Sequence, residues 1–124
     1  MPTKITARLR FKLGTVILLG PGKTDLLQAI DRTGSISAAA RAMGMSYKRA
    51  WQLVDEMNRH LNKPVVVAAF GGSHGGGAHL TPFGQEVLCR YRRMLTSLET
   101  ALAEDIAWLD SHAVEAKQGL VKQR

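Results

Sequence analysis

The chain is short of cysteine, of long apolar runs and of acidic residues, and each shortage excludes a class of protein. Cys89 is the only cysteine, so no internal disulfide can form, which argues for a reducing compartment. No uncharged apolar stretch approaches the ~20 residues that a membrane-spanning helix needs. The longest one near the start, Val16–Leu19, is also shorter than the roughly 7–15 residues of a signal-peptide core. We therefore expect a cytoplasmic protein that does not enter a membrane.

The shortage of acidic residues is confined to one part of the chain. The 124 residues carry a net charge of +7. Residues 1–93 contain 14 Lys and Arg against five Asp and Glu, whereas residues 94–124 contain three against five. Such a basic surface is typical of phosphate binding, although it also serves solubility or an acidic protein partner. Length and an apolar content of 45% fit one domain with a modest core.

Residues 34–58 read as two short helices joined by a tight turn. Ser37 is suited to cap the alanine-rich first helix. Gly44 follows where the chain must turn, at a position that favours positive φ, and Ser46 can cap the second helix. Helix, short turn and capped helix is the pattern that places a recognition helix in the DNA major groove, although helical hairpins also occur in proteins that never bind DNA.

The second helix has an apolar face and a polar face. Its apolar residues recur every three or four positions and are predicted to lie in the core. Its outward residues near the start are those that would meet base edges or phosphates. The residues of this motif that we expect to contact DNA are Ser37, Ser46, Tyr47, Lys48, Arg49, Trp51 and Gln52.

These side chains suit different parts of a DNA duplex. Lys48 or Arg49 could read guanine and Gln52 could read adenine, each contributing ~1–3 kcal/mol of discrimination. Tyr47 could contact a phosphate or a thymine methyl group. Two roles stay open for Trp51, which could pack against the first helix of the motif or contact DNA.

The segment before this motif combines a hairpin with a helix. Arg8–Leu13 alternates charged and apolar residues, which is typical of a half-buried strand, and Val16–Leu19 follows as its partner. Gly-Pro-Gly at residues 20–22 interrupts the chain. A helix with one apolar face is predicted from about Thr24, and Thr33-Gly34 ends it.

A glycine-rich loop follows the motif. Val65–Phe70 is extended after a proline, five of the seven residues at 71–77 are glycine, and residues 78–80 can return as a short strand. Strand, loop and strand after a recognition helix form the wing of a winged helix. The glycines would let the backbone approach a DNA groove, and Ser73 and His74 are the candidate contacts in this loop.

A long last helix is predicted from Thr81 and Pro82, which suit the N-cap and the first helical position, to about Leu109. Its apolar residues fall at alternating steps of three and four, the spacing of a coiled-coil seam, with Asp105 as the only polar break. A small domain cannot cover a helix of some 40 Å, at ~1.5 Å per residue, so we expect a homodimer. The alternative is a helix that packs on its own domain. The predicted seam residues are Leu88, Tyr91, Leu95, Leu98, Leu102 and Leu109.

These elements predict a mainly α protein with a small β wing, a winged helix-turn-helix followed by a long C-terminal dimerisation helix. The N-terminal hairpin segment is expected over residues 1–21 and the winged helix-turn-helix over 22–80. The dimerisation helix is expected over 81–110 and a polar tail over 111–124.

Several local patterns imitate other sites. Residues 20–24 resemble the end of a phosphate-binding P-loop, but Ile17 stands where that motif needs its first glycine. Lys23 is better explained as part of a cationic helix start near DNA phosphates. The two histidines of the wing lack the partners of a tetrahedral metal site, and Cys89 is best explained as a structural or surface thiol. With no nucleophile–base pair in view, we expect no enzyme, metal or cofactor.

Five short motifs stand out across the middle of the chain: Gly-Ser-Ile-Ser-Ala-Ala-Ala-Arg at 34–41, Met-Ser-Tyr-Lys-Arg-Ala-Trp at 45–51, Glu-Met-Asn at 56–58, the glycine-rich loop at 71–78 and Leu-Thr-Pro-Phe-Gly at 80–84. Together they resemble the DNA-binding domain of ModE-type molybdate-responsive regulators, over roughly residues 22–100. The first motif alone is similar to LysR-type regulators as well. The second motif combined with the glycine-rich loop is the more specific feature.

The resemblance implies a winged helix-turn-helix that dimerises and binds a palindromic operator in double-stranded DNA. Members of the ModE family sense molybdate through C-terminal oxyanion-binding domains with a Ser-Ala-Arg-Asn motif, which this sequence does not contain. We therefore expect a single-domain form without molybdate sensing, whose effector, a small molecule or a protein, the sequence does not specify. The alternatives are a winged-helix protein-interaction module and a non-specific DNA-binding accessory protein. Affinity that depends on DNA sequence and falls steeply with salt would favour the regulator.

Overall fold

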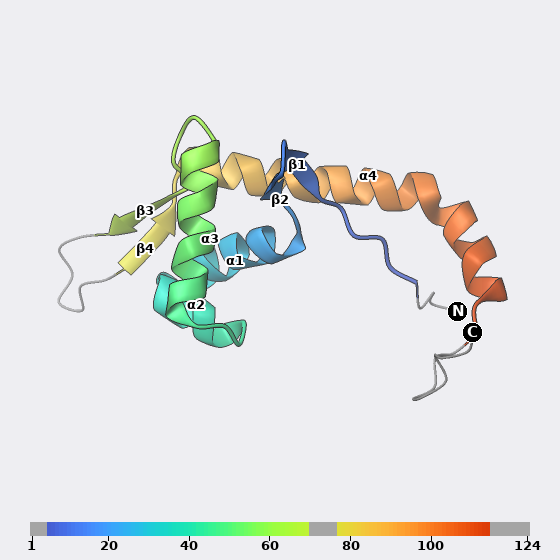
Figure 1. The fold of residues 1–124 in the computed structure, drawn as a ribbon, viewed down its shortest axis with the longest axis horizontal. Helices are drawn as coiled ribbons and strands as arrows, with labels where there is room; N and C mark the ends of the chain where they lie inside the picture. The colour runs from blue at the N-terminus through green and yellow to red at the C-terminus, as the bar shows by residue number, and fades with distance from the viewer. Residues whose placement is uncertain (1–4, 70–76, 115–124) are drawn as a thin grey trace. The chain divides into compact units, whose positions relative to one another are not determined.

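The computed structural model describes residues 5–69 and 77–114 (Figure 1). Within these ranges the elements follow in the order β1, β2, α1, α2, α3, β3, β4 and α4. The described residues from Arg8 to Leu95 belong to one compact unit, and residues 5–7 and 96–114 belong to a second. The predicted architecture, mainly helical with a small β wing, is confirmed.

The chain begins with the predicted antiparallel hairpin of β1 (Phe11–Leu13) and β2 (Val16–Leu19). Gly14 forms its turn at a φ of 63°, which a residue with a side chain rarely adopts. A bulge just after Phe11 shifts the register of the two strands. The paired part of the first strand is shorter than the alternating pattern predicted, because the segment from Arg8 does not join the ladder.

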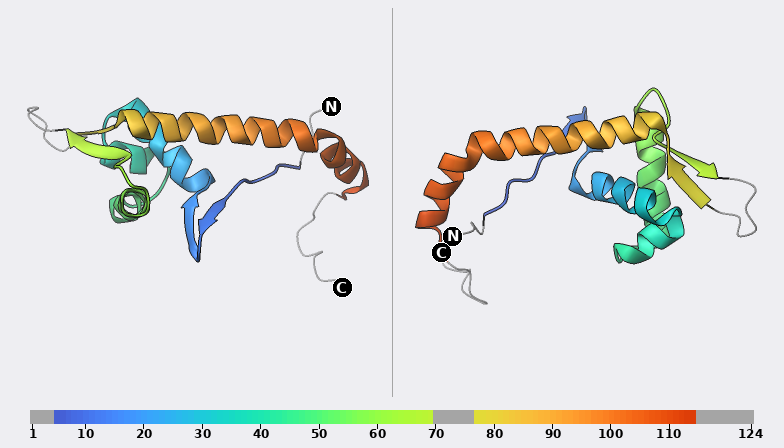
Figure 2. Two further views of the ribbon diagram at one scale, coloured as in Figure 1. Left: turned by 90° about the horizontal axis from the view of Figure 1, so that it is seen from above. Right: turned by 180° about the vertical axis from the view of Figure 1, so that it is seen from behind.

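Three helices follow, α1 (Pro21–Thr33), α2 (Ile36–Ala42) and α3 (Tyr47–His60), and they pack against one another in both views of Figure 2. The first starts nearly one turn earlier than predicted, because the fixed φ of proline suits the first helical position. Gly34 and Gly44 take φ values of 78° and 68° where α1 and α2 end. These two glycines make the sharp turns between the helices possible.

The helix caps agree with the sequence at one serine and differ at another. The hydroxyl oxygen of Ser46 accepts the backbone N–H of Arg49 at 3.0 Å, as predicted. The expected cap at Ser37 is wrong, because Ser35 accepts the N–H of Ala38 at 2.8 Å and α2 has already begun at Ile36. Ser35 has the extended backbone of a cap residue, whereas Ser37 lies inside the first turn of α2.

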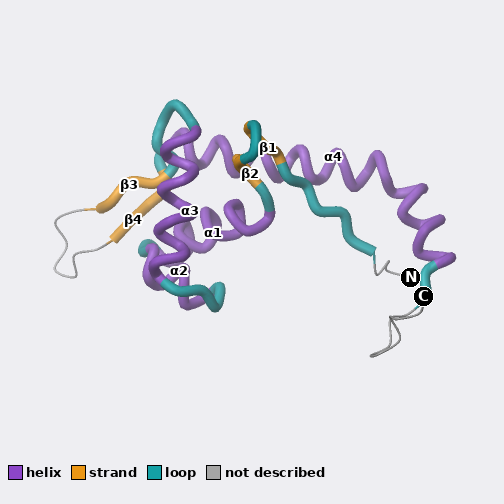
Figure 3. Tube along the Cα trace, in the orientation of Figure 1, coloured by secondary structure: helices purple, strands orange, loops and turns teal. Residues whose placement is uncertain are grey.

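The wing consists of β3 (Val66–Ala69) and β4 (Gly77–Leu80), two antiparallel strands that lie beside α3 (Figure 3). Val66 stands opposite Leu80 in the register, so the base of the wing carries buried side chains on both strands. The N–H of Ala78 donates to the carbonyl of Gly34 at 2.9 Å, which ties the returning strand to the end of α1.

The last helix, α4 (Pro82–His112), begins as predicted, with the hydroxyl oxygen of Thr81 accepting the N–H of Gly84 at 2.9 Å. It ends three residues beyond the predicted Leu109. Its first turns contribute to a core that α1, α2, α3 and the wing complete. The largest fully buried side chains of that core are Leu26, Leu27, Ile30, Met57 and Val65.

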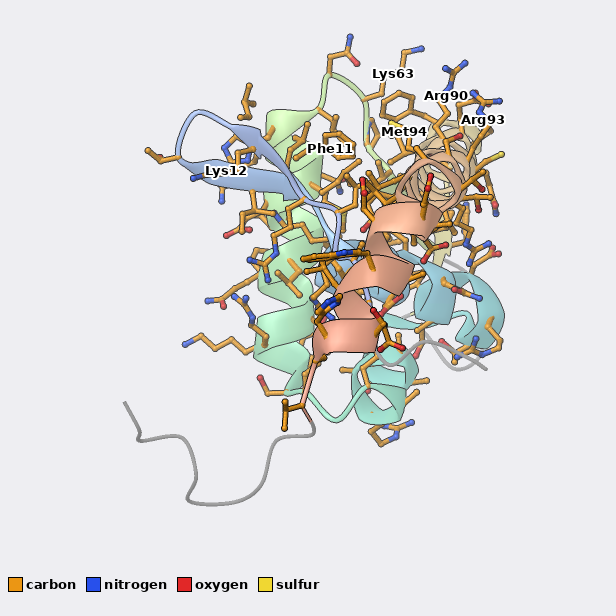
Figure 4. All side chains as sticks on the ribbon, turned by 90° about the vertical axis from the view of Figure 1, so that its right-hand side faces the viewer. Phe11, Lys12, Lys63, Arg90, Arg93 and Met94 are labelled. Carbon is orange, nitrogen blue, oxygen red and sulfur yellow. The ribbon has the colours of Figure 1, made fainter. Side chains whose placement is uncertain are left out.

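The hairpin packs on the same part of α4. The ring of Phe11 meets the ring of Tyr91 edge to face, with centroids 6.4 Å apart. The hydroxyl of Tyr91 donates to the carbonyl of Leu9 at 2.7 Å, and burial raises the pKa of that hydroxyl above its usual 10.0, so it remains a donor. Lys12 projects from the other face of the hairpin (Figure 4).

The close approach of α4 to the wing predicts which glycine cannot be replaced. A Cβ added at Gly84 would collide with the backbone carbonyl of Val65, so Gly84→Ala should destabilise the protein by about 1–3 kcal/mol or more. Gly22, also helical, has nothing within 4 Å of such a Cβ, and Gly22→Ala should be neutral or raise stability by ~0.5–1 kcal/mol. Urea unfolding followed by circular dichroism measures both, and equal midpoints would contradict the close contact.

Candidate nucleic-acid interface

The helix α3 buries one face and presents the other to solvent. Its buried stripe consists of Ala50, Leu53, Val54 and Met57, as the apolar spacing predicted. Because these side chains anchor the helix in the core, the opposite face projects rigidly from the domain. A rigid, exposed helix of this kind is what contact with a DNA groove requires.

The predicted contact residues at the start of α3 are exposed. Lys48, Arg49 and Gln52 lie on the surface. Tyr47 and Trp51 expose 55% and 48% of their surface, high values for large rings. Trp51, whose role the sequence left open, is thus largely available for contact with another molecule.

These exposed residues form three strips along the helix, since successive side chains are about 100° apart. Tyr47 and Trp51 line a depression of 280 Å³ between α3 and the wing. Arg49 lines a cavity of 540 Å³ between α3, the hairpin and the start of α1. Lys48 and Gln52 lie in the strip between these two hollows. The structure therefore separates an aromatic flank of α3 from a cationic one.

Lys23, at the start of α1, is buried rather than exposed. Its ammonium donates to the carbonyl of Ile17 and pairs with the carboxylate of Glu56 on α3 at 2.9 Å. The expectation that Lys23 stands near DNA phosphates is wrong, because only 6% of this side chain is exposed and its charge is already paired. Hydrogen bonding from Lys23 lowers the pKa of Glu56 below its usual 4.5, with nearby arginines contributing.

This ion pair and one amide are features that the sequence analysis missed. The pair joins residues far apart in the chain, and no local pattern signals it. Asn58 on α3 accepts the N–H of Val65 at 2.7 Å and donates to the carbonyl of Val66 at 3.1 Å. Because one side chain satisfies two backbone groups at the start of β3, it fixes the wing to the recognition helix.

The serines and the wing loop complete the predicted set. Ser46 caps α3, and Ser37 is exposed on α2, where its hydroxyl accepts a hydrogen bond from Arg41 at 3.3 Å. Both serines therefore lie at helix starts with backbone N–H groups nearby, a position that suits phosphate. Ser73 and His74 lie outside the described residues.

The predicted seam residues of α4 fall into two groups. Leu88 and Tyr91 are 4% and 3% exposed and pack in the core of their own chain, and Leu95 packs partly against it. Leu98 and Leu102 are half-buried, and Leu109 is 50% exposed. The later leucines thus have more surface left for a partner than the earlier ones.

Other parts of the described chain offer little for chemistry. Lys63, Arg90 and Arg93 point outward around the start of α4 (Figure 4), and Arg90 pairs with Glu86 at 2.6 Å. Within residues 5–69 and 77–114, no cluster of His, Cys, Asp or Glu could hold a metal ion. Within the same residues, no helix is both apolar and long enough to span a membrane.

The packing of α1, α2 and α3 with the β3–β4 wing defines a winged helix-turn-helix domain. A model of the bacterial regulatory helix-turn-helix proteins, lysR family, matches residues 23–85. The chain belongs to this family.

Two relatives show which members of the family this chain resembles. The molybdenum-pterin-binding protein MopB of Rhodobacter capsulatus is 49% identical over 96 residues, which cover 72% of this chain and 36% of MopB. The DNA-binding transcriptional dual regulator ModE of Escherichia coli (strain K12) is 41% identical over 83 residues, 67% of this chain and 32% of ModE. The resemblance to ModE-type regulators is thus confirmed, and the chain spans about a third of the length of these relatives.

A solved structure supports the same fold. The crystal structure of the CbnR_DBD–DNA complex matches with a TM-score of 0.57 at 18% identity, over 71% of this chain and 95% of that one. At 18% identity, this likeness shows that the two chains share a fold.

The ion pair between Lys23 and Glu56 predicts how stability depends on pH. Because the folded state lowers the pKa of Glu56 below 4.5, its carboxylate contributes stability above that pH, and the contribution is lost as the pH falls through the lowered value. Glu56→Gln should cost about 1–2 kcal/mol at neutral pH, a figure reduced by the partial exposure of the carboxylate. The difference from the unmodified protein should vanish in acid.

The control is the exposed pair of Glu86 and Arg90, whose side chains are 56% and 60% exposed. Glu86→Gln should change stability by less than ~0.5 kcal/mol at any pH. Urea unfolding of the three proteins from acid to neutral pH measures the effect. A Glu56→Gln penalty that persists unchanged in acid would show that the ion pair is not its cause.

Proposed function

We propose that this chain is a sequence-specific DNA-binding transcriptional regulator, cytoplasmic and without catalytic activity. The observation that carries the proposal is the start of α3, where Tyr47, Lys48, Trp51 and Gln52 project side by side from a helix anchored in the core. Its relative in E. coli is a DNA-binding transcriptional regulator, and CbnR_DBD, which shares the fold, binds DNA. Both likenesses support the proposal.

In this proposal α3 enters the major groove, and its different strips contact bases and phosphates. Lys48 and Gln52, on the central strip, are suited to read guanine and adenine edges. Arg49, on the flank near the hairpin, is suited to a phosphate at the groove wall. Ser37 and Ser46 would bind phosphates at the helix starts. The wing, with Ser73 and His74, would contact an adjacent groove.

We also propose that two copies associate through α4 and read an inverted repeat. Leu98, Leu102 and Leu109 keep the spacing of a coiled-coil seam and retain exposed apolar surface. Trp108, 62% exposed, adds to the apolar surface in that part of the helix. Leu88, Tyr91 and Leu95 would support the seam from within the core rather than form it.

Selection of bound duplexes from a randomised DNA pool, followed by sequencing, tests the proposal. Enrichment of an inverted repeat is expected, and its half-site spacing would measure the distance between two recognition helices. Enrichment of no sequence, together with binding that is insensitive to salt, would favour a protein-interaction module instead.

Lys48→Ala should weaken binding to the selected sequence by roughly 5- to 150-fold, corresponding to ~1–3 kcal/mol, because a base contact is lost. Binding to a random duplex should weaken much less. The control is Arg92→Ala, which removes an exposed positive charge from another helix and should affect both duplexes alike. Fluorescence anisotropy at fixed salt measures these affinities, and an equal loss on both duplexes for Lys48→Ala would assign Lys48 to a phosphate.

Replacing Leu98 and Leu102 together by glutamate should convert the dimer into a monomer, because charges at adjacent seam positions cannot be buried. Glu99→Lys, at an exposed position of the same helical turn, is the control and should leave the dimer intact. Size-exclusion chromatography with light scattering measures the mass. A doubly substituted protein that keeps its dimer mass would refute the seam.

A further inference from the structure

The depression between α3 and the wing combines apolar side chains with nearly as much exposed polar surface. It has a volume of 280 Å³ and opens to solvent beside the recognition helix. Its main lining residues are Ile36 on α2, Tyr47, Trp51 and Val54 on α3, and Val67 and Ala68 on β3.

The one side-chain amide in the lining already makes two hydrogen bonds to the backbone. Asn58 uses its oxygen for the N–H of Val65 and its nitrogen for the carbonyl of Val66. The hydroxyl of Tyr47 and the indole N–H of Trp51 have no hydrogen-bond partner within residues 5–69 and 77–114, and both side chains line the depression. A ligand in this hollow would therefore meet aromatic and aliphatic side chains together with polar groups of similar exposed area.

The hollow adjoins the strip of α3 that carries Lys48 and Gln52, both exposed. If these polar residues lie along base edges, the rings of Tyr47 and Trp51 face the same groove one position to the side. In a DNA major groove, the apolar group that base pairs present is the 5-methyl group of thymine. The aromatic flank and the methyl group are thus both apolar, and both would lie in the same groove.

We propose that Tyr47 and Trp51, supported by Ile36 and Val67, form a site that reads the 5-methyl groups of thymine. This inference rests on the proposed function and deepens it. It assigns base selection on the wing side of α3 to apolar contact, and it assigns hydrogen-bonded readout to Lys48 and Gln52. Each half-site should accordingly require thymine at one or two fixed positions next to the bases that Lys48 and Gln52 read.

Replacement of thymine by deoxyuridine tests the site, since it removes the methyl group and leaves base pairing intact. Each thymine of the selected duplex is replaced singly, and affinity is measured by fluorescence anisotropy. At one or two positions per half-site, deoxyuridine should weaken binding about fourfold, the value expected for one buried methyl group. At the other positions, affinity should stay unchanged.

Two variants assign the effect to the proposed residues. With Trp51→Ala or Tyr47→Ala, binding to the thymine duplex should weaken, and deoxyuridine at the sensitive positions should make little further difference. Gln28→Ala, at an exposed position of α1, is the matched control and should keep the full fourfold effect. Circular dichroism checks that the variants fold. We expect them to fold, because all three substitutions lie at exposed helical positions.

The outcomes separate this inference from the proposed function. A selected operator whose affinity is unchanged by every single deoxyuridine would overturn the methyl site and leave the DNA-binding regulator intact. A deoxyuridine effect equally large in the aromatic variants would place the methyl contact elsewhere and overturn the assignment. If no sequence is selected at all, the regulator itself fails, and the methyl site fails with it.

Discussion

The backbone around Val65 is the point on which the arrangement of the reading surface depends. Its N–H donates to Asn58 of α3, its carbonyl accepts the N–H of Thr81 at the start of α4, and Gly84 packs directly against it. The neighbouring carbonyl of Pro64 accepts the hydroxyl of Thr81 at 2.7 Å. Recognition helix, wing and last helix are therefore fixed to one another within a few residues, and the hollow beside Trp51 follows from that junction.

Features set by short-range geometry could be predicted from the sequence. The caps at Ser46 and Thr81, the turn at Gly44 and the buried stripe of α3 each depend on residues within one or two helical turns. The sequence offers two serines two positions apart as caps, Ser35 and Ser37, and in the structure the N-cap of α2 is Ser35, whose backbone is extended. Local chemistry allows both, and the packing of α2 decides between them.

Features that depend on distant partners could not be predicted. Lys23 lies in a stretch that resembles an exposed basic helix start, yet Glu56 on another helix holds its charge inside the domain. The leucine spacing of α4 is one continuous pattern, although its first members pack into their own core. Periodicity shows which face is apolar and does not show which surface covers it. For the site, the sequence identified the exposed residues of α3, while their separation into two flanks required the hairpin and wing in place.

The hydrogen bond from Tyr91 to Leu9 joins residues 82 positions apart, and this separation affects when the hairpin can pack during synthesis. During synthesis Leu9 emerges before Tyr91, which follows about 4–16 s later at ~5–20 residues per second. Until then the hairpin lacks the ring and hydroxyl of Tyr91, and β2 has α1 and α3 to pack against. The hairpin is thus translated well before α4, and its packing is complete only when α4 has been made.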